Sequence, residues 1–189
     1  MVAGSSCTTG WCANSPRVRR DLLLAIDPAL IPELEGSADS EVLFHLALTF
    51  GLEDDPLTAL EYMVGFVEEV GHRHEVEYPI QMTIATSDGE RIIAARYSSE
   101  GQSRSLYVST DARALKAQHP DIEELQGLSD EARAIVSEPL GDVVGAWNKV
   151  PESSIGIVKP GRDELYEFTP RRPGGEGPPP KERVSLVPS

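Results

Sequence analysis

Several features that mark other classes of protein are scarce in this sequence of 189 residues. It contains two cysteines, 17 basic against 31 acidic residues, and no uncharged apolar run near the roughly 20 residues that span a bilayer. Two cysteines are too few for a disulfide scaffold. The net charge of -14 disfavours phosphate backbones and anionic membranes as partners. We therefore expect a cytoplasmic protein with no nucleic-acid partner and no membrane partner.

Residues suited to hold a metal ion are also few. Four residues separate Cys7 from Cys12 in a stretch rich in serine, threonine and glycine, and the four histidines are scattered along the chain. A structural zinc site needs four cysteine or histidine ligands grouped in close pairs, and no such grouping is present in the sequence. We expect no metal and no cofactor.

The chain divides into three stretches by composition. Residues 1–16 show neither helical nor strand periodicity, and we interpret them as an anomalous or misread N-terminal stretch. Regular apolar periodicity begins at Arg17 and continues to Pro170, a length suited to one domain with one core. Residues 171–189 are rich in proline and glycine and hold too little apolar material to offset the entropy cost of ordering. We expect a disordered tail there.

Two helices are predicted in the first half of the domain. From Ser40 onward, apolar residues recur with helical spacing, and Gly51 stands where a helix C-cap is expected. A second helix is expected from Asp55 to about His74, because Pro56 occupies the favoured first position and an apolar stripe follows. The exposed side of this helix is expected to carry Glu61, Glu68 and Glu69.

Strand periodicity begins after Pro79. A tight turn at Asp88-Gly89 predicts a hairpin between the strand that starts there and a second strand over residues 91–98. A third strand over residues 105–109 is expected to continue this antiparallel meander. A second hairpin, over residues 154–158 and 164–169, closes the domain. Helices and antiparallel strands in separate blocks predict an α+β fold.

Several short motifs follow one another along the domain. They are Gly36-Ser37-Ala38-Asp39-Ser40-Glu41, Ala95-Arg96-Tyr97-Ser98, Ser105-Leu106-Tyr107, Ser137-Glu138-Pro139-Leu140, Trp147 and Val150-Pro151-Glu152. In this order they resemble the class II glutamine amidotransferases, specifically the small stand-alone type related to the ergothioneine-pathway enzyme. The resemblance covers residues 17–170. It implies the N-terminal-nucleophile fold, an αββα sandwich of antiparallel sheets, here incomplete at the N-terminus.

The resemblance gives Asp39 a role in substrate binding. In the family, the aspartate of a Ser/Thr-Asp-Ser/Thr-Glu motif binds the α-amino group of glutamine, and such a carboxylate selects the amino-acid end of the substrate. The residues alone leave an alternative, in which Asp39 caps the helix that begins at Ser40 or Glu41. The two roles are compatible.

Arg96 and Ser98 are further candidates for substrate binding, because they end a strand beside a polar loop. The alternative for Arg96 is a solvated charge, which is the common state of an arginine at a strand end. His45 lies within an apolar helix, so we expect a core or boundary histidine. We expect Trp147 to be a packing aromatic.

The family pattern breaks at the nucleophile. The mature chain of the family begins with a cysteine whose thiol attacks the amide and whose α-amino group relays the proton, while an Asn-Gly pair supplies the oxyanion hole. In this sequence Val2 follows Met1, and the amino nitrogens of Cys7 and Cys12 are tied into peptide bonds. We therefore assign no catalytic residue.

The opening residues offer an explanation. Ser5 to Gly10 can be encoded as TCG TCC TGC ACA ACG GGT, and a shifted frame of the same bases, GTC CTG CAC AAC GGG, reads Val-Leu-His-Asn-Gly. We hypothesise that residues 1–16 are an out-of-frame translation of the region that carries the His-Asn-Gly motif. An intact frame in resequenced DNA, with no Met-Cys start upstream, would refute this.

Two functions stay open at this stage. The first is part of a glutamine amidotransferase domain whose substrate is glutamine or a γ-glutamyl compound. Because this sequence lacks the N-terminal cysteine, we expect the chain to be inactive. The second is a non-catalytic amino-acid-binding or regulatory module. Either could act with a partner synthase or as a homo-oligomer.

Overall fold

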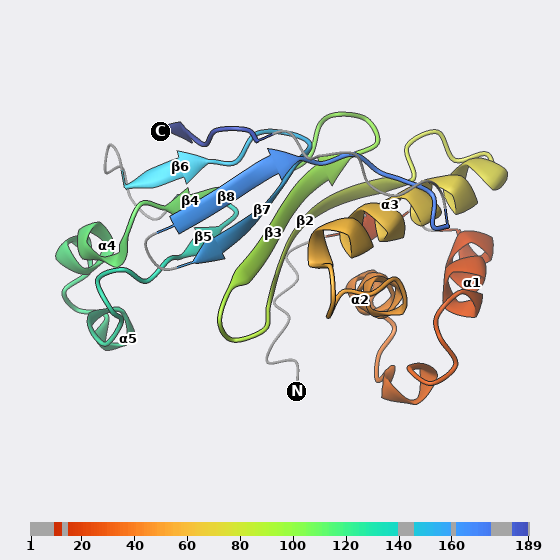
Figure 1. Ribbon diagram of the computed structural model, residues 1–189, viewed down its shortest axis with the longest axis horizontal. Coiled ribbons are helices and arrows are strands. Elements are labelled where there is room, and N and C mark those ends of the chain that lie inside the picture. The colour runs from red at the N-terminus through yellow and green to blue at the C-terminus, as the bar shows by residue number, and fades with distance from the viewer. Residues whose placement is uncertain (1–9, 13–14, 140–145, 160–161, 175–182, 189) are drawn as a thin grey trace.

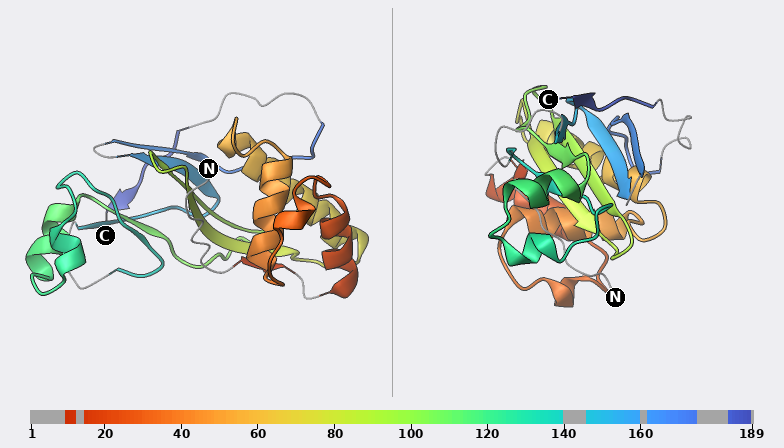
Figure 2. Two further views of the ribbon diagram at one scale, coloured as in Figure 1. Left: turned by 90° about the horizontal axis from the view of Figure 1, so that it is seen from below. Right: turned by 90° about the vertical axis from the view of Figure 1, so that its left-hand side faces the viewer.

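The computed structural model describes residues 10–12, 15–139, 146–159, 162–174 and 183–188. The chain forms two antiparallel β-sheets, with three longer helices at one end of the molecule and two short helices at the other (Figures 1 and 2). Among the described helices, none is long and apolar enough to cross a membrane. The predicted α+β fold is confirmed.

The helices α1, α2 and α3 cover one face of the larger sheet (Figure 1). Asp55 caps the third by accepting a hydrogen bond from the backbone N–H of Thr58, and Gly51 has the positive φ of 93° expected after the second. The bounds are α1 Pro16–Leu24, a 3₁₀ turn Ile31–Glu33, α2 Asp39–Thr49 and α3 Pro56–Arg73. Both predicted helices are confirmed.

The larger sheet has the strand order β1-β2-β3-β7-β8, and all of its neighbours are antiparallel. The predicted first hairpin is the pair β2 and β3, and its turn is held by Asp88, which accepts hydrogen bonds from the backbone N–H groups of Glu90 and Arg91. These bonds and the Arg91 guanidinium lower the pKa of Asp88 to about 2. The bounds are β1 Gly10–Cys12, β2 Ile80–Ser87, β3 Ile92–Ser98, β7 Ser154–Lys159 and β8 Arg162–Glu167.

The smaller sheet corrects one prediction from the sequence. The strand expected to extend the first hairpin is β4, and it lies in this second sheet, because β7 already occupies the free edge of β3. The strand order is β5-β4-β6-β9. The bounds are β4 Tyr107–Ser109, β5 Ile135–Val136, β6 Trp147–Lys149 and β9 Val187–Pro188.

Alternation along β4 separates two further layers. Leu106 and Val108 pack between the two sheets, whereas Tyr107 packs with Leu115 and Trp147 on the outer face of the smaller sheet. That outer face is covered by α4 (Ala112–Gln118), next to α5 (Glu123–Gln126). The layers therefore follow the order helix, sheet, sheet, helix.

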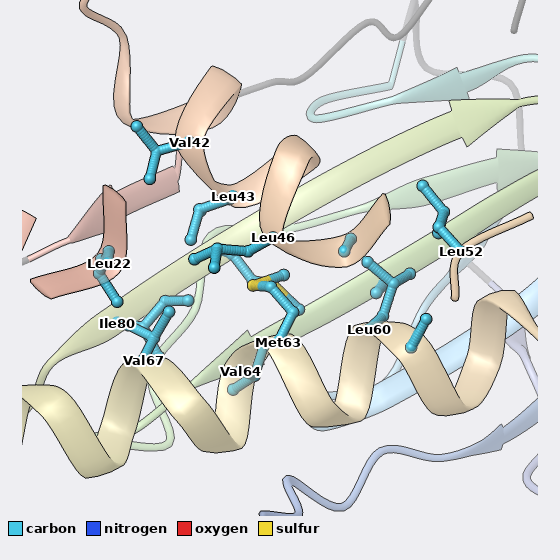
Figure 3. Packing of buried hydrophobic residues seen from close by; sticks show 14 of the residues in the cluster. Leu22, Val42, Leu43, Leu46, Leu52, Leu60, Met63, Val64, Val67 and Ile80 are labelled. Atoms are coloured by element: carbon cyan, nitrogen blue, oxygen red, sulfur yellow. The ribbon is translucent and has the colours of Figure 1, made fainter. Parts of the chain in front are cut away.

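The largest core lies between the long helices and the larger sheet. Leu46 of α2, Met63 of α3 and Ile80 of β2 meet there with at most 1% of their surface exposed (Figure 3). Leu22 brings α1 against the same cluster. Full burial of one such side chain contributes about 1.5–3 kcal/mol, so this face is the main source of stability in the fold.

Glu61 departs from the expected exposed side of α3, since none of its surface is exposed. Its Oε2 lies 2.9 Å from Nη2 of Arg171, and its Oε1 accepts a hydrogen bond from the backbone N–H of Thr169. A Cβ at Gly65 would overlap the carbonyl oxygen of Arg171. A buried charge needs a partner, and the chain after β8 supplies one by lying directly on α3.

Glu68 is also not simply solvated. Its Oε1 accepts hydrogen bonds from the hydroxyl of Tyr97 at 2.6 Å and from Oγ of Ser99 at 2.8 Å. Burial, followed by this carboxylate, raises the pKa of Tyr97. Glu69 does lie on the exposed side, where it pairs with Arg73.

The segment after residue 170 contacts the domain through two described stretches, one at Arg171 and one over residues 184–188. Arg171 pairs with α3, and β9 pairs with β6 through Lys149 opposite Val187. The backbone N–H of Val184 donates to the carbonyl of Leu165. The expected disordered tail is therefore in contact with the domain at 171 and over 184–188, while residues 175–182 and 189 lie outside the described residues.

Candidate functional site

Asp39 occupies the first position of α2. Ala38 is the N-cap, with φ -70° and ψ 141°, and no side-chain hydrogen bond caps the helix. The Asp39 carboxylate turns toward α1, where Oδ1 accepts a hydrogen bond from Nη1 of Arg19 at 3.0 Å. The side chains are 38% and 30% exposed, respectively. The alternative in which Asp39 caps the helix is therefore wrong for this structure.

Glu41 of the same motif holds the loop that enters α2. Its Oε1 accepts from the backbone N–H of Glu35 at 2.7 Å, and its Oε2 accepts from that of Gly36 at 2.9 Å. These hydrogen bonds lower the pKa of Glu41. A Cβ at Gly36 would lie 3.0 Å from Oε2, so a glycine lets the loop close on the carboxylate. The carboxylate of Glu41 thus holds the loop at the start of α2, whereas the carboxylate of Asp39 faces α1.

A cavity of about 520 Å³ opens between α2 and β2. The first turn of α2 contributes Ala38, Ser40 and Glu41, His45 follows one turn later, and residues 84–86 of β2 form the opposite wall. Asp39 does not line it. Within the described residues, β1 pairs with β2 only along 80–82, so the β2 edge beside the cavity has no strand partner.

Arg96 is buried rather than solvated, with 9% of its surface exposed. Its Nη1 donates to the carbonyl of Val150 at 2.7 Å and its Nε donates to Oγ of Ser103 at 2.8 Å. Nη2 lies 3.2 Å from a carboxylate oxygen of Glu152. The solvated alternative is thus wrong, and these contacts tie β3 to the chain leading into and out of the smaller sheet.

Ser98 is 4% exposed, and its hydroxyl accepts a hydrogen bond from the backbone N–H of Glu100. In β3, Ala95 packs against the helices and Ala94 packs between the sheets. Residues two apart share a face of a strand, so Arg96 and Ser98 point away from the helices. The structure therefore does not bring these two residues together with Asp39, and their role in substrate binding stays a prediction.

Two further expectations are confirmed. His45 is 6% exposed, and its Nδ1 lies 2.8 Å from the carbonyl oxygen of Glu41. Trp147 is 1% exposed in the cluster under α4. In the part of the chain that the structure describes, no group of three or more His, Cys, Asp or Glu side chains could hold a metal ion.

Comparisons with known proteins agree with the fold and the motifs. No family model matches the sequence. The chain is 26% identical over 190 residues to the probable glutamine amidotransferase DUG3 of Saccharomyces cerevisiae, covering 85% of this chain and 53% of the yeast protein. It superposes with a TM-score of 0.72 on a glutamine aminotransferase class-II domain protein from Silicibacter pomeroyi, at 28% identity, covering 88% of this chain and 67% of the other.

The chain is a class II glutamine amidotransferase-like domain. It spans about half the length of the yeast protein that it matches. The structural comparison supports the fold of the amidotransferase-like domain.

Sequence reasoning found Asp39 but missed its contact with Arg19. Twenty positions separate the two residues, and only the packing of α1 beside α2 brings them together. No periodicity or motif in a single sequence marks such a pair. Glu41 lies in the same motif as Asp39. Its hydrogen bonds to the loop depend on the backbone conformation at Glu35 and Gly36, which the spacing of residues in the motif does not predict.

Proposed function

We propose that this amidotransferase-like domain binds glutamine or a γ-glutamyl compound by its α-ammonium group, with Asp39 as the anionic partner. The supporting observation is the carboxylate of Asp39, which stands at the start of α2 and is partly exposed. Within the described residues, it accepts a hydrogen bond from one side chain, through one of its oxygens. A carboxylate that is still in contact with water can bind the ammonium group of a ligand directly. It does not pay the free-energy cost of being buried without a partner.

We also propose that this chain alone does not hydrolyse the amide. Amide cleavage needs a nucleophile, a base and donors for the oxyanion. The only cysteines are Cys7 and Cys12, and neither carries a free α-amino group in this sequence. Cys7 lies outside the described residues. Binding without turnover is the behaviour of the second candidate, a non-catalytic amino-acid-binding module.

The out-of-frame hypothesis remains part of this proposal. Gly10 is the one residue of the 5–10 stretch that the structure describes, and it lies in β1 opposite Met82. Sequencing the DNA upstream of the codon for Arg17 tests the hypothesis. A shifted frame that continues to a Met-Cys start supports it, and an uninterrupted frame without such a start refutes it.

We propose a partner for the edge of β2 along residues 83–87, which has no strand partner within the described residues. An unpaired strand edge is a template for another strand, and proteins normally cover such edges. The partner could be a synthase that receives ammonia or a second copy of the chain. Sedimentation of the purified chain distinguishes a monomer from a homo-oligomer.

Two measurements on the purified chain test the proposed function. Calorimetry with glutamine should show binding, and an assay for ammonia should show no release from glutamine. Asp39→Asn should strongly weaken the binding of glutamine, whereas Asp54→Asn, which changes an exposed carboxylate just before α3, should leave the affinity unchanged. Ammonia release would refute the proposed inactivity, and an unchanged affinity in Asp39→Asn would refute the role of Asp39.

A further inference from the structure

Arg19 is the side chain that meets Asp39, and its role is not explained by the proposed function. We propose that Arg19 is a positioning residue, which holds the Asp39 carboxylate so that Oδ2 faces the incoming α-ammonium group. This inference rests on the proposed binding of glutamine by Asp39. Arg19 itself touches the carboxylate and does not take part in any chemical step.

Arg19 is presented by a helix that is firmly packed. Its neighbour Val18 has 0% of its surface exposed and Leu22 has 2%, so α1 is anchored in the main core. A second contact ties α1 to the end of α3, where Oδ2 of Asp21 lies 2.8 Å from Nε2 of His74. Since α1 is anchored on two sides, the guanidinium starts from a fixed backbone and can restrain the carboxylate that it contacts.

The contact leaves acceptor capacity on Asp39. A carboxylate offers about four lone-pair sites on its two oxygens. Arg19 uses Oδ1, and within the described residues no hydrogen bond reaches Oδ2. An ammonium group can therefore bind Oδ2 while the contact with Arg19 stays in place. Asp39 does not cap α2, so within the described residues the hydrogen bond from Arg19 is the one that orients its carboxylate.

The positive charge of Arg19 also acts on the ligand. It repels an ammonium group and attracts a carboxylate, and glutamine carries both on the same carbon atom. With both side chains about one-third exposed, water and salt screen these opposed effects. Orientation of the Asp39 carboxylate is then the main contribution of Arg19 to the binding of an amino acid.

Calorimetry on the full chain with two ligands tests the proposal. The ligands are glutamine and 5-amino-5-oxopentanoate, which is glutamine without its α-amino group. Arg19→Ala should weaken glutamine binding roughly threefold to tenfold, the range for one polar side chain that must be immobilised on binding. The same variant should weaken the analogue less than twofold, and Arg19→Lys should restore part of the loss. Arg20→Ala, on the exposed side of the same helix, should change neither affinity.

The outcomes separate this inference from the proposed function. Equal loss for both ligands in Arg19→Ala would mean a general structural effect and would overturn the positioning role. Unchanged or tighter glutamine binding would overturn it as well, because Arg19 would then be idle or a competitor for Asp39. If Asp39→Asn leaves glutamine binding intact, or if the unaltered chain binds no glutamine, the proposed function itself fails and the role of Arg19 fails with it.

Discussion

The two faces of the larger sheet are stabilised in different ways. The face under α1, α2 and α3 is an apolar core of large aliphatic side chains, such as Leu46 and Met63 (Figure 3). The face toward the smaller sheet has a smaller apolar cluster and a buried polar network centred on Arg96. Apolar packing is non-directional, whereas hydrogen bonds need defined geometry. The comparison indicates that the helices supply stability and that Arg96 fixes how the two sheets meet.

The largest effect is expected from Arg96→Met. This change leaves the carbonyl of Val150 and the carboxylate of Glu152 without their guanidinium partner in a mostly buried place. Breaking a buried ion pair from one side typically costs 3–5 kcal/mol, so we expect a loss of about 4 kcal/mol in the free energy of unfolding, measured by urea denaturation. Adding Glu152→Gln should recover part of the loss. A loss below about 1 kcal/mol would show that the network does not hold the sheets together.

On the helical face, Leu46→Ala should cost about 3 kcal/mol, because the side chain has 0% of its surface exposed and the cavity would be only partly refilled. Urea denaturation gives this value on the same scale as for Arg96. The matched control is Leu24→Ala, whose side chain is 71% exposed and whose loss should stay within about 0.5 kcal/mol. Equal losses for the two leucines would contradict the assignment of the main core to this face.

Arg171→Ala should cost about 2 kcal/mol, less than the roughly 3–5 kcal/mol typical for a buried ion pair broken from one side, because a backbone hydrogen bond to Glu61 remains. It removes the guanidinium from the fully buried Glu61, while the backbone N–H of Thr169 still donates to that carboxylate. Thermal denaturation is a suitable measurement. Arg172→Ala is the control, because that side chain is 79% exposed and lies 3.7 Å from Glu69. If both variants melt alike, the pair with Glu61 contributes little.

The smallest effect concerns the exposed rim of the helical face. The pKa of Glu41 is lowered by the backbone N–H groups of Glu35 and Gly36, so its stabilising contribution is present above its unfolded pKa and is lost as pH falls through the folded pKa. Glu41→Gln should therefore lower Tm at pH 7 and make Tm less sensitive to pH between about 5 and 3. A variant with the same acid dependence as the unaltered chain would contradict this contact.

The parts of the fold that were predictable are those governed by local patterns. The helix at Pro56, the hairpin at Asp88-Gly89 and the burial of Trp147 depend on neighbouring residues or on apolar character. The sheet to which β4 belongs depends instead on which edge β7 occupies, and no local pattern encodes that competition. Long-range pairing therefore accounts for the error in the meander.

The candidate site was predictable only in part, for a similar reason. Asp39 was found because a short motif carries it, but its contact with Arg19 exists only after α1 packs beside α2.

Outside the site, Glu61 was expected on the exposed side of α3, and its burial depends on Arg171, more than a hundred residues later in the chain. A charged residue on a helix looks the same in sequence whether its partner is water or a distant side chain.

The position of glutamine on this chain tests the central claim most directly. A crystal structure of the purified chain with glutamine should place the α-amino nitrogen about 3 Å from Oδ2 of Asp39, with Arg19 still bonded to Oδ1. Glutamine bound elsewhere, with its α-amino group away from Asp39, would contradict the account.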